Sequence, residues 1–407
     1  MRAWILGLVL AAGCAAAGSD AVESNEANAT ERAALDVNDV SFLFPLPATI
    51  ADASDLLATD AKAAHGPLLS AESFKRLVSY AFPDPTEDAT FPANGFDQQK
   101  NWRVVAARFD PCAKTDPKDV VCNVQLRLVA QAIQPGKGSD ALHAADQAMH
   151  LIYQFEGAEA KALETDILAL KKDQRTNGKA LGPHPIMQEE GLQGAYAKAL
   201  KDVISKYAGE ERLPFATVMV TLNAGLWRFA RGDRSASGLT QAQVPFSPEK
   251  TIALHGTTGF IGNFILDVQP PATGTDNVND IVQTGGSATP AFKGDFFKMP
   301  AERQSAAVSA ALRIDNPTMH QPGTTDCVSC HQASRSLRRF KGAPFLDARD
   351  GDPNRYVPPA GVTTKFSGDK DGGEYNVHAF GYLGRDVALT QGVINSSAEV
   401  IRQLRSR

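Results

Sequence analysis

Three residues with chemically active side chains lie together in the C-terminal third of the chain: Cys327, Cys330 and His331, in the order C-x-x-C-H. Residues three positions apart share one face of a helical turn, so both thiols can reach the same ligand, and the imidazole follows directly. Thiols and imidazoles bind metals, and thiols also form covalent and redox bonds. Three functions are open for this cluster: attachment of a prosthetic group, a zinc site, or a redox-active cysteine pair.

The spacing resembles the covalent haem attachment motif of c-type cytochromes. The resemblance covers residues 327–331 and implies one covalent haem c, bound through the thiols of Cys327 and Cys330, with His331 as the proximal iron ligand. A zinc site would need a fourth ligand such as His320, and the second C-x-x-C or H-x-x-x-H half of such a site is missing. A redox pair is expected early, in a βα unit, whereas this motif lies late, among Pro and Gly.

The second axial ligand of such a haem is less clearly marked. Small single-haem cytochromes usually have a methionine after the motif, and no methionine follows Met319 in this chain. His378 is the one histidine after the motif, in an aromatic and extended-looking segment, so we predict it as the distal ligand. The alternatives are an open site or one of Met319, His320, His150, Met149 and Met299. The basic run Arg335, Arg338, Arg339 and Lys341 either pairs with the haem propionates or forms a solvated helix face.

The N-terminus carries an export signal. A basic start at residues 1–2 precedes an apolar run at 4–12 that is too short to span a membrane comfortably. The run ends in Leu-Ala-Ala-Gly-Cys, which resembles the lipobox of bacterial lipoproteins and implies cleavage of residues 1–13 and lipidation of Cys14. An ordinary secretory signal is the alternative. We expect a lipid-anchored protein of the bacterial cell envelope, facing the periplasm or cell surface. In some bacteria, an aspartate directly after the lipidated cysteine retains a lipoprotein in the inner membrane. Residue 15 is an alanine, so the outer membrane is favoured.

The remaining two of the five cysteines predict a disulfide. Cys112 and Cys122 are left once Cys14 takes the lipid and the C-x-x-C-H motif takes the haem. Disulfides persist in exported proteins. The flanking runs 102–109 and 122–128 have the alternating or apolar pattern of strands, so a Cys112–Cys122 bond would close a nine-residue hairpin loop.

Composition and charge indicate a large globular protein. The chain has 407 residues and a net charge of −5, without a basic block, so we expect no nucleic-acid partner. Residues 14–38 are small, polar and acidic and predict a flexible tether. We expect an α+β fold: a β-rich domain with several helices at 39–295, then a mainly helical or irregular haem-binding region at 296–407. The boundary is placed by a Gly-, Pro-, Thr- and Asp-rich stretch at 270–296.

Local patterns predict most of the elements. Ser70 is expected to cap a helix that ends before Pro83, and Thr325 or Asp326 to lie at the start of a helix that contains the C-x-x-C-H motif. Further strands are expected at 150–155, 217–222, 226–229, 251–255 and 260–268. Further helices are expected at 159–173, 189–207, 300–312 and 396–404.

Together these features predict a lipid-anchored, single-haem c-type cytochrome that passes electrons to a redox partner protein. One alternative is a haem enzyme of the peroxidase or oxidase type, with an open distal site. Another is an envelope binding lipoprotein in which the haem is structural. The sequence has no G-x-S-x-G, H-E-x-x-H or P-loop motif, so we expect an electron carrier rather than a catalyst.

Overall fold

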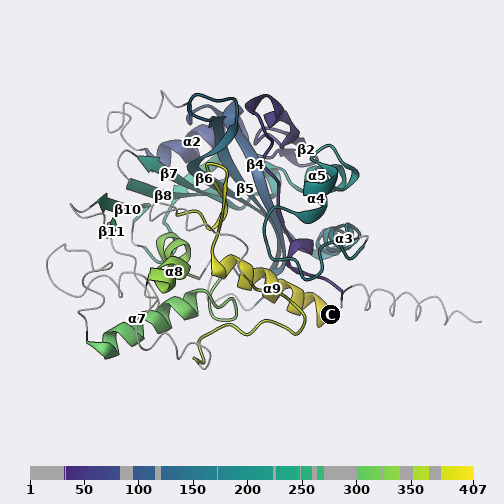
Figure 1. Ribbon diagram of the computed structural model, residues 1–407. Helices are drawn as coiled ribbons and strands as arrows, with labels where there is room; N and C mark the ends of the chain where they lie inside the picture. The colour runs from purple at the N-terminus through teal and green to yellow at the C-terminus, as the bar shows by residue number, and fades with distance from the viewer. Residues whose placement is uncertain are drawn as a thin grey trace, which may run out of the picture.

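The computed structural model describes most of the chain. The described residues are 32, 34–82, 95–114, 121–171, 173–222, 226–247, 249–258, 264–269, 300–321, 324–339, 352–365 and 377–407. They form a large antiparallel sheet with helices on both of its faces, which confirms the predicted α+β class (Figure 1). The predicted signal peptide and Cys14 lie outside the described residues. The end of the predicted tether is folded, because Leu35 and Val37 are buried.

The sheet has nine strands in the described part of the chain. Their order is β1-β4-β5-β6-β7-β8-β10-β11, with β9 paired to β8, and every pair is antiparallel. The strands are β1 (Ser41–Leu43), β4 (Trp102–Ala113), β5 (Asn123–Pro135), β6 (Leu142–Phe155), β7 (Phe215–Leu222), β8 (Leu226–Ser235), β9 (Gly238–Ala242), β10 (Thr251–Thr258) and β11 (Phe264–Gln269). Two small hairpins lie apart from it: β2 (Lys62–Ala63) with β3 (Gly66–Pro67), and β12 (Phe380–Leu383) with β13 (Asp386–Leu389).

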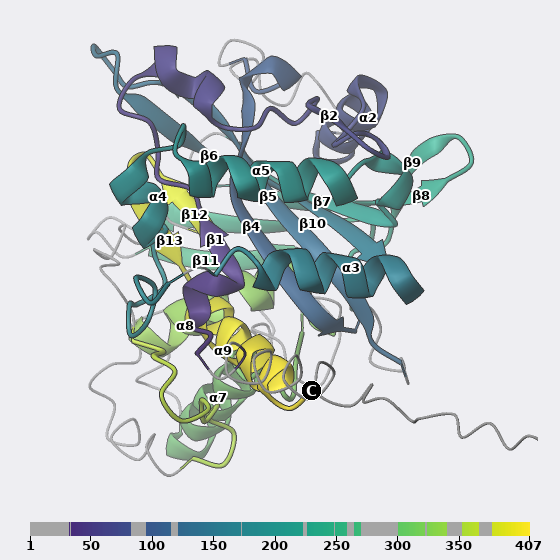
Figure 2. The ribbon, with the colours of Figure 1, turned by 90° about the vertical axis from the view of Figure 1, so that its right-hand side faces the viewer.

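Helices cover the two faces of the sheet separately. Those of the first part are α2 (Ala71–Ala81), α3 (Gly157–Leu168), α4 (Pro185–Glu190) and α5 (Ala195–Tyr207), and those of the last part are α7 (Ala301–Ile314), α8 (Cys327–Arg339) and α9 (Gln391–Arg405). Short 3-10 turns are η1 (Val37–Asp39), η2 (Ile50–Asp55), η4 (Gln99–Asn101) and η5 (Glu210–Arg212). Figure 1 shows α3, α4 and α5 on one side of the sheet and α7, α8 and α9 on the other, and Figure 2 shows α3 and α5 in front of the strands.

Capping and turn residues explain where several helices begin and end. Ser70 caps α2 as predicted, because its hydroxyl accepts a hydrogen bond from the Ser73 N–H at 3.2 Å. The single helix predicted at 189–207 is instead two helices, α4 and α5. The chain turns between them at Gly191, whose φ of 76° is in the left-handed region that favours glycine.

The two faces of the sheet differ in character, as β6 illustrates. Met149, Leu151 and Tyr153 point to one face and are fully buried in the main hydrophobic core. His150 and Ile152 alternate with them and point to the opposite face, where they line a cavity. One face is therefore fully packed at these positions, and part of the other lines a cavity.

The C-terminal part of the chain is joined to this second face. Buried side chains of α9 and of the β12–β13 hairpin belong to the same hydrophobic cluster as the sheet. Gln131 on β5 and the backbone of Tyr382 on β12 exchange two hydrogen bonds of 2.8 Å each. Helices α7 and α8 pack together through a smaller cluster that includes Ala311, Ala333 and Leu337. The boundary predicted near 296 falls within 270–299, outside the described residues.

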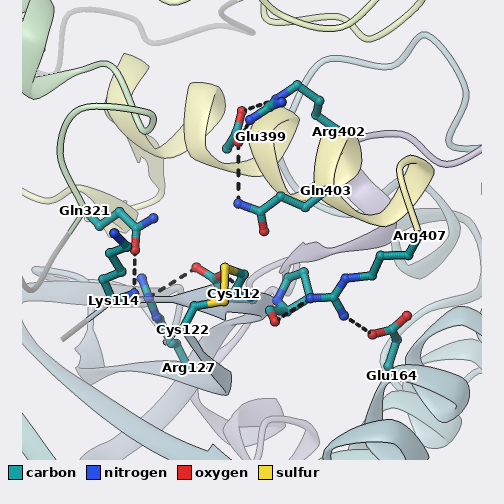
Figure 3. Close-up of a disulfide and its surroundings, with 12 residues drawn as sticks. Cys112, Lys114, Cys122, Arg127, Glu164, Gln321, Glu399, Arg402, Gln403 and Arg407 are labelled. Atoms are coloured by element: carbon teal, nitrogen blue, oxygen red, sulfur yellow. Dashed lines mark hydrogen bonds and ion pairs between the residues drawn. A yellow bond between two sulfur atoms is a disulfide. The ribbon is translucent and has the colours of Figure 1, made fainter. Parts of the chain in front are cut away.

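The predicted disulfide is present. Cys112, in β4, and Cys122, just before β5, are bonded, with their Cα atoms 4.7 Å apart (Figure 3). Next to it, the Lys114 N–H donates a hydrogen bond of 2.6 Å to Oε1 of Gln321, a residue of the segment that leads into α8. The disulfide therefore lies where the β4–β5 hairpin meets the C-terminal part of the chain.

Candidate cofactor site

Helix α8 begins at the first cysteine of the motif because Asp326 caps it. The Asp326 carboxylate accepts a hydrogen bond from the Ser329 N–H at 2.9 Å, and its carbonyl accepts one from the Cys330 N–H at 3.0 Å. Of the two residues predicted at this position, Asp326 is the cap. The cap fixes the first turn of the helix, so Cys327 and Cys330 lie on one face of it.

That face of α8 forms one wall of a cavity. Cys327, Cys330 and His331 all line it, and the opposite wall is the face of β4, β5, β6, β7 and β8 that carries His150. The space between these walls, counted together with its open mouth, is about 1150 Å³. The structure thus brings the three residues of the motif to one cavity beside the sheet.

The imidazole of His331 is oriented for ligation. Its Nδ1 lies 2.5 Å from the carbonyl oxygen of Val377, and a carbonyl only accepts, so the Nδ1 carries the proton. The Nε2 keeps its lone pair, the arrangement found in metal-bound histidines. Burial lowers the pKa of His331 to about 3, which keeps the ring neutral at neutral pH. The ring of Phe229 packs edge-on against it, with 5.2 Å between the ring centroids.

The two thiols are free and half-buried. Burial raises the pKa of Cys330 to about 12 and raises that of Cys327 still further above its usual value. Redox-active C-x-x-C cysteines have the opposite property, a lowered pKa that makes the thiolate available. The surroundings of these thiols therefore disfavour a redox pair.

Four cationic side chains line the cavity, from Arg108, Arg127, Arg231 and Lys114, and no Asp or Glu is among its described lining residues. Arg108 and Arg127 are cross-strand partners on β4 and β5 and share the single carboxylate of Asp110, at 3.6 and 3.2 Å. This buried group of two guanidinium ions and one carboxylate therefore has a net charge of +1.

Two buried donors on the same wall lack an acceptor. Within the described part of the chain, neither the Arg108 Nε nor the Gln125 Nε2 has a hydrogen-bond partner. Unpartnered buried donors are rare in folded proteins, because each costs about 1–3 kcal/mol. A bound carboxylate would supply both the missing acceptor and the missing negative charge.

Two potential iron ligands also line the cavity from the sheet, His150 on β6 and Met219 on β7. The His150 ring is nearly parallel to that of His331, with 17° between the planes and 5.9 Å between the centroids. The sequence raised His150 only as one of several alternatives and did not raise Met219. The signal that identifies both is their place on one face of paired strands, where Ala148 pairs with Met219 and His150 with Thr217.

His378, the ligand predicted from the sequence, lies elsewhere. It is buried, its Nε2 is 3.0 Å from the Oδ1 of Asp146, and it is not among the residues that line the cavity. Its carbonyl accepts a hydrogen bond of 3.0 Å from Arg335, one helical turn after His331. This segment, which also supplies the Val377 carbonyl, therefore holds α8 and His331 in place.

The other predicted residues are placed as follows. Met319 is exposed, the His320 Nδ1 lies 3.1 Å from the Thr324 carbonyl, and Met149 points to the opposite face of β6. Met299, Lys341 and the side chains of Arg338 and Arg339 lie outside the described residues.

Two further features are absent from the described residues. These residues contain no group of three or more His, Cys, Asp or Glu side chains placed to hold a metal ion among themselves. The described residues thus place no fourth zinc ligand beside the C-x-x-C-H motif. No helix in the same residues combines the length and the apolar character needed to cross a membrane.

Comparison with known proteins adds no assignment. No family model, no curated protein and no solved structure matches the chain.

Proposed function

We propose that this protein is a c-type cytochrome that binds one haem covalently through Cys327 and Cys330, with His331 as the proximal iron ligand. The observation that carries the proposal is that both thiols and the imidazole line one cavity, opposite a cationic face of the sheet. The mainly helical C-terminal region would provide the proximal side of the haem, and the sheet of the N-terminal region the opposite wall.

Three features of the side chains that line the cavity fit a haem. The thiols and the imidazole come from one helical turn, as vinyl attachment and iron ligation require. The cavity walls include the apolar side chains of Phe229 and Phe380, which suit a porphyrin. Arg108 and Arg127 present guanidinium groups for the propionate carboxylates, and they replace the basic run after the motif as our candidates for this role.

The haem would supply one-electron redox chemistry, and the protein would control it. The Val377 carbonyl orients the His331 ring and raises its basicity as a ligand. The aromatic and aliphatic walls would limit the contact of the haem with water, and buried guanidinium groups would favour the added electron because they stabilise negative charge. These effects suit an electron carrier that exchanges electrons with a redox partner protein.

We also propose that the protein works outside the cytoplasm, attached through lipid on Cys14 to the bacterial envelope, with the outer membrane preferred. Covalent haem attachment takes place in that compartment. The Cys112–Cys122 disulfide supports the same location, because structural disulfides are rare in reducing compartments.

The decisive experiment is expression in a host with haem c maturation. We expect the denatured protein to stain for haem on a gel and to carry one haem by intact mass. Cys327→Ser with Cys330→Ser should abolish the covalent haem, because no thiol remains to form a thioether. The control, Cys112→Ser with Cys122→Ser, removes the same number of thiols elsewhere and should keep the haem. Wild-type protein without covalent haem would refute the proposal.

A further inference from the structure

We infer that His150 is the second axial ligand of the haem iron, supplied by the sheet from the side opposite His331. This inference rests on the proposed function, since it concerns the same haem. It assigns to the N-terminal region a direct part in binding the haem, beyond forming a wall of the cavity.

The positions of the two histidine rings carry the inference. Metal–imidazole bonds are about 2 Å long, so two imidazoles on opposite sides of one metal ion have centroids about 6 Å apart. The centroids of His150 and His331 are 5.9 Å apart, and both residues line the same cavity. Their nearly parallel rings come from elements far apart in the sequence, one from β6 and one from α8.

The surroundings of His150 leave its nitrogens available. Within the described part of the chain, the His150 ring contacts one other side-chain ring, that of His331. No hydrogen bond there involves either ring nitrogen of His150. The residue is only half-buried, because its ring faces the cavity rather than the core. A free imidazole beside a second imidazole is a donor set that suits iron.

The backbone at His150 is rigid, as a ligand position requires. Strand β6 is in the interior of the sheet, and His150 pairs with Val129 on β5 and with Thr217 on β7. Ligands on strands are held more precisely than ligands on loops. Hydrogen bonds on both sides of β6 therefore fix the distance between the sheet and the haem.

Two other residues are the competitors. Met219 lines the cavity on the neighbouring strand and would give a histidine–methionine pair. His378 is engaged with Asp146 and does not line the cavity. The ring geometry favours His150 over both.

Ligation by His150 would settle the class of function. An iron with two protein ligands has no free position for peroxide or oxygen, so the protein would carry electrons and would not act as a peroxidase. Two imidazole ligands also give a lower reduction potential than a histidine–methionine pair. The partner would then be a low-potential electron donor or acceptor.

The test is optical and electron paramagnetic resonance spectroscopy of four purified haem-loaded variants: His150→Gly, His150→Met, Met219→Leu and His378→Ala. We expect the wild type to be low-spin and unaffected by cyanide or carbon monoxide. His150→Gly should become high-spin, bind both ligands, and return to low-spin when imidazole is added. His150→Met should stay six-coordinate with a higher reduction potential. Met219→Leu and His378→Ala should keep the wild-type spectrum.

The outcomes separate the two proposals. Haem staining of each variant shows whether the covalent haem is present, independently of its spin state. If haem is attached and both His150 variants keep the wild-type spectrum, the assignment of His150 is wrong while the cytochrome remains. Loss of the low-spin spectrum in Met219→Leu or His378→Ala alone would give the ligand to that residue. Absence of covalent haem from the wild type would refute the proposed function itself.

Discussion

The charge states of the cavity side chains follow from their burial. Burial lowers the pKa of His150 to about 4 and that of His331 to about 3, so both rings are neutral at neutral pH. Burial also lowers the pKa of Arg108, to about 10, and this guanidinium remains charged. The cavity thus combines neutral nitrogens, which bind metals, with fixed positive charge, which binds carboxylates.

His184, a buried histidine outside the cavity, predicts how stability depends on pH. It is fully buried and stacks on Tyr196 with 4.5 Å between the centroids, and burial lowers its pKa to about 4. The unfolded state, with a histidine pKa of about 6.5, takes up the proton first. The free energy of unfolding should therefore fall as the pH drops from about 7 to about 4, by up to about 3 kcal/mol from this residue.

The measurement is urea unfolding of the wild type and of His184→Phe at pH 7 and pH 5. Phenylalanine keeps the ring stack but cannot take up a proton, so the variant should lose less stability between the two values. If both proteins lose the same free energy of unfolding between pH 7 and pH 5, His184 is not the source of the pH dependence. The comparison cancels the other titrating groups, which both proteins share.

At the level of elements, α8 has two functional faces. Ala333 and Leu337 pack against α7, and Val328 belongs to the main core beside the sheet. The motif occupies the first turn, where the Asp326 cap, the Val377 carbonyl and the Arg335 side chain hold the helix in place. The proposed haem ligand, His331, is therefore on a helix whose start, side and loop contacts are all fixed.

The disulfide of the β4–β5 hairpin gives a prediction about stability at the level of elements. Replacing Cys112 and Cys122 by serine removes the bond that closes its loop. The free energy of unfolding should decrease by about 2–3 kcal/mol, mainly because the unfolded chain gains freedom. Urea unfolding without reductant measures the change. Adding a reductant should destabilise the wild type and leave the double variant unchanged; equal stability of both proteins without reductant would show that the bond contributes nothing.

At the level of the whole molecule, the cavity is shared between the two halves of the chain. The sheet contributes the arginines and His150, and the C-terminal part contributes the cysteines and His331. A sheet of this size is more than the proposed electron transfer would need, and it also forms the second wall of the cavity. Among the described residues, burial begins at Leu35, which is 21 positions after Cys14 in the sequence.

The proposed lipid anchor gives the prediction for the whole molecule. Cys14→Ser removes the acceptor for lipid, so the variant should move from the membrane fraction to the soluble fraction of the cell, whereas the wild type stays with the membranes. Protease treatment of intact cells then distinguishes the periplasm from the cell surface. Membrane association of Cys14→Ser at the wild-type level would contradict lipidation.

The sequence predicts the helices and strands better than it predicts which residue lies opposite His331 in the cavity. Helix α2, the β4–β5 hairpin and the capped start of α8 each follow from a local pattern of spacing and capping residues. The proximity of His150 to His331 depends on how β6 and α8 pack, which no local pattern encodes. The aromatic residues near His378 suggested a haem contact, but Tyr382 is a core residue that donates a hydrogen bond to the Phe44 carbonyl.

The position of both thiols inside the cavity has a consequence for the order of assembly. In the finished fold, Cys327 and Cys330 face the sheet across the cavity, and desolvation raises the pKa of both thiols. If haem is attached as proposed, attachment would be easier before the C-terminal segment closes onto the sheet. The motif also follows residues 102–235 in the chain, and these residues form much of the cavity wall. The order of synthesis would therefore let the sheet fold while the motif is still accessible, and the haem would then complete the closure.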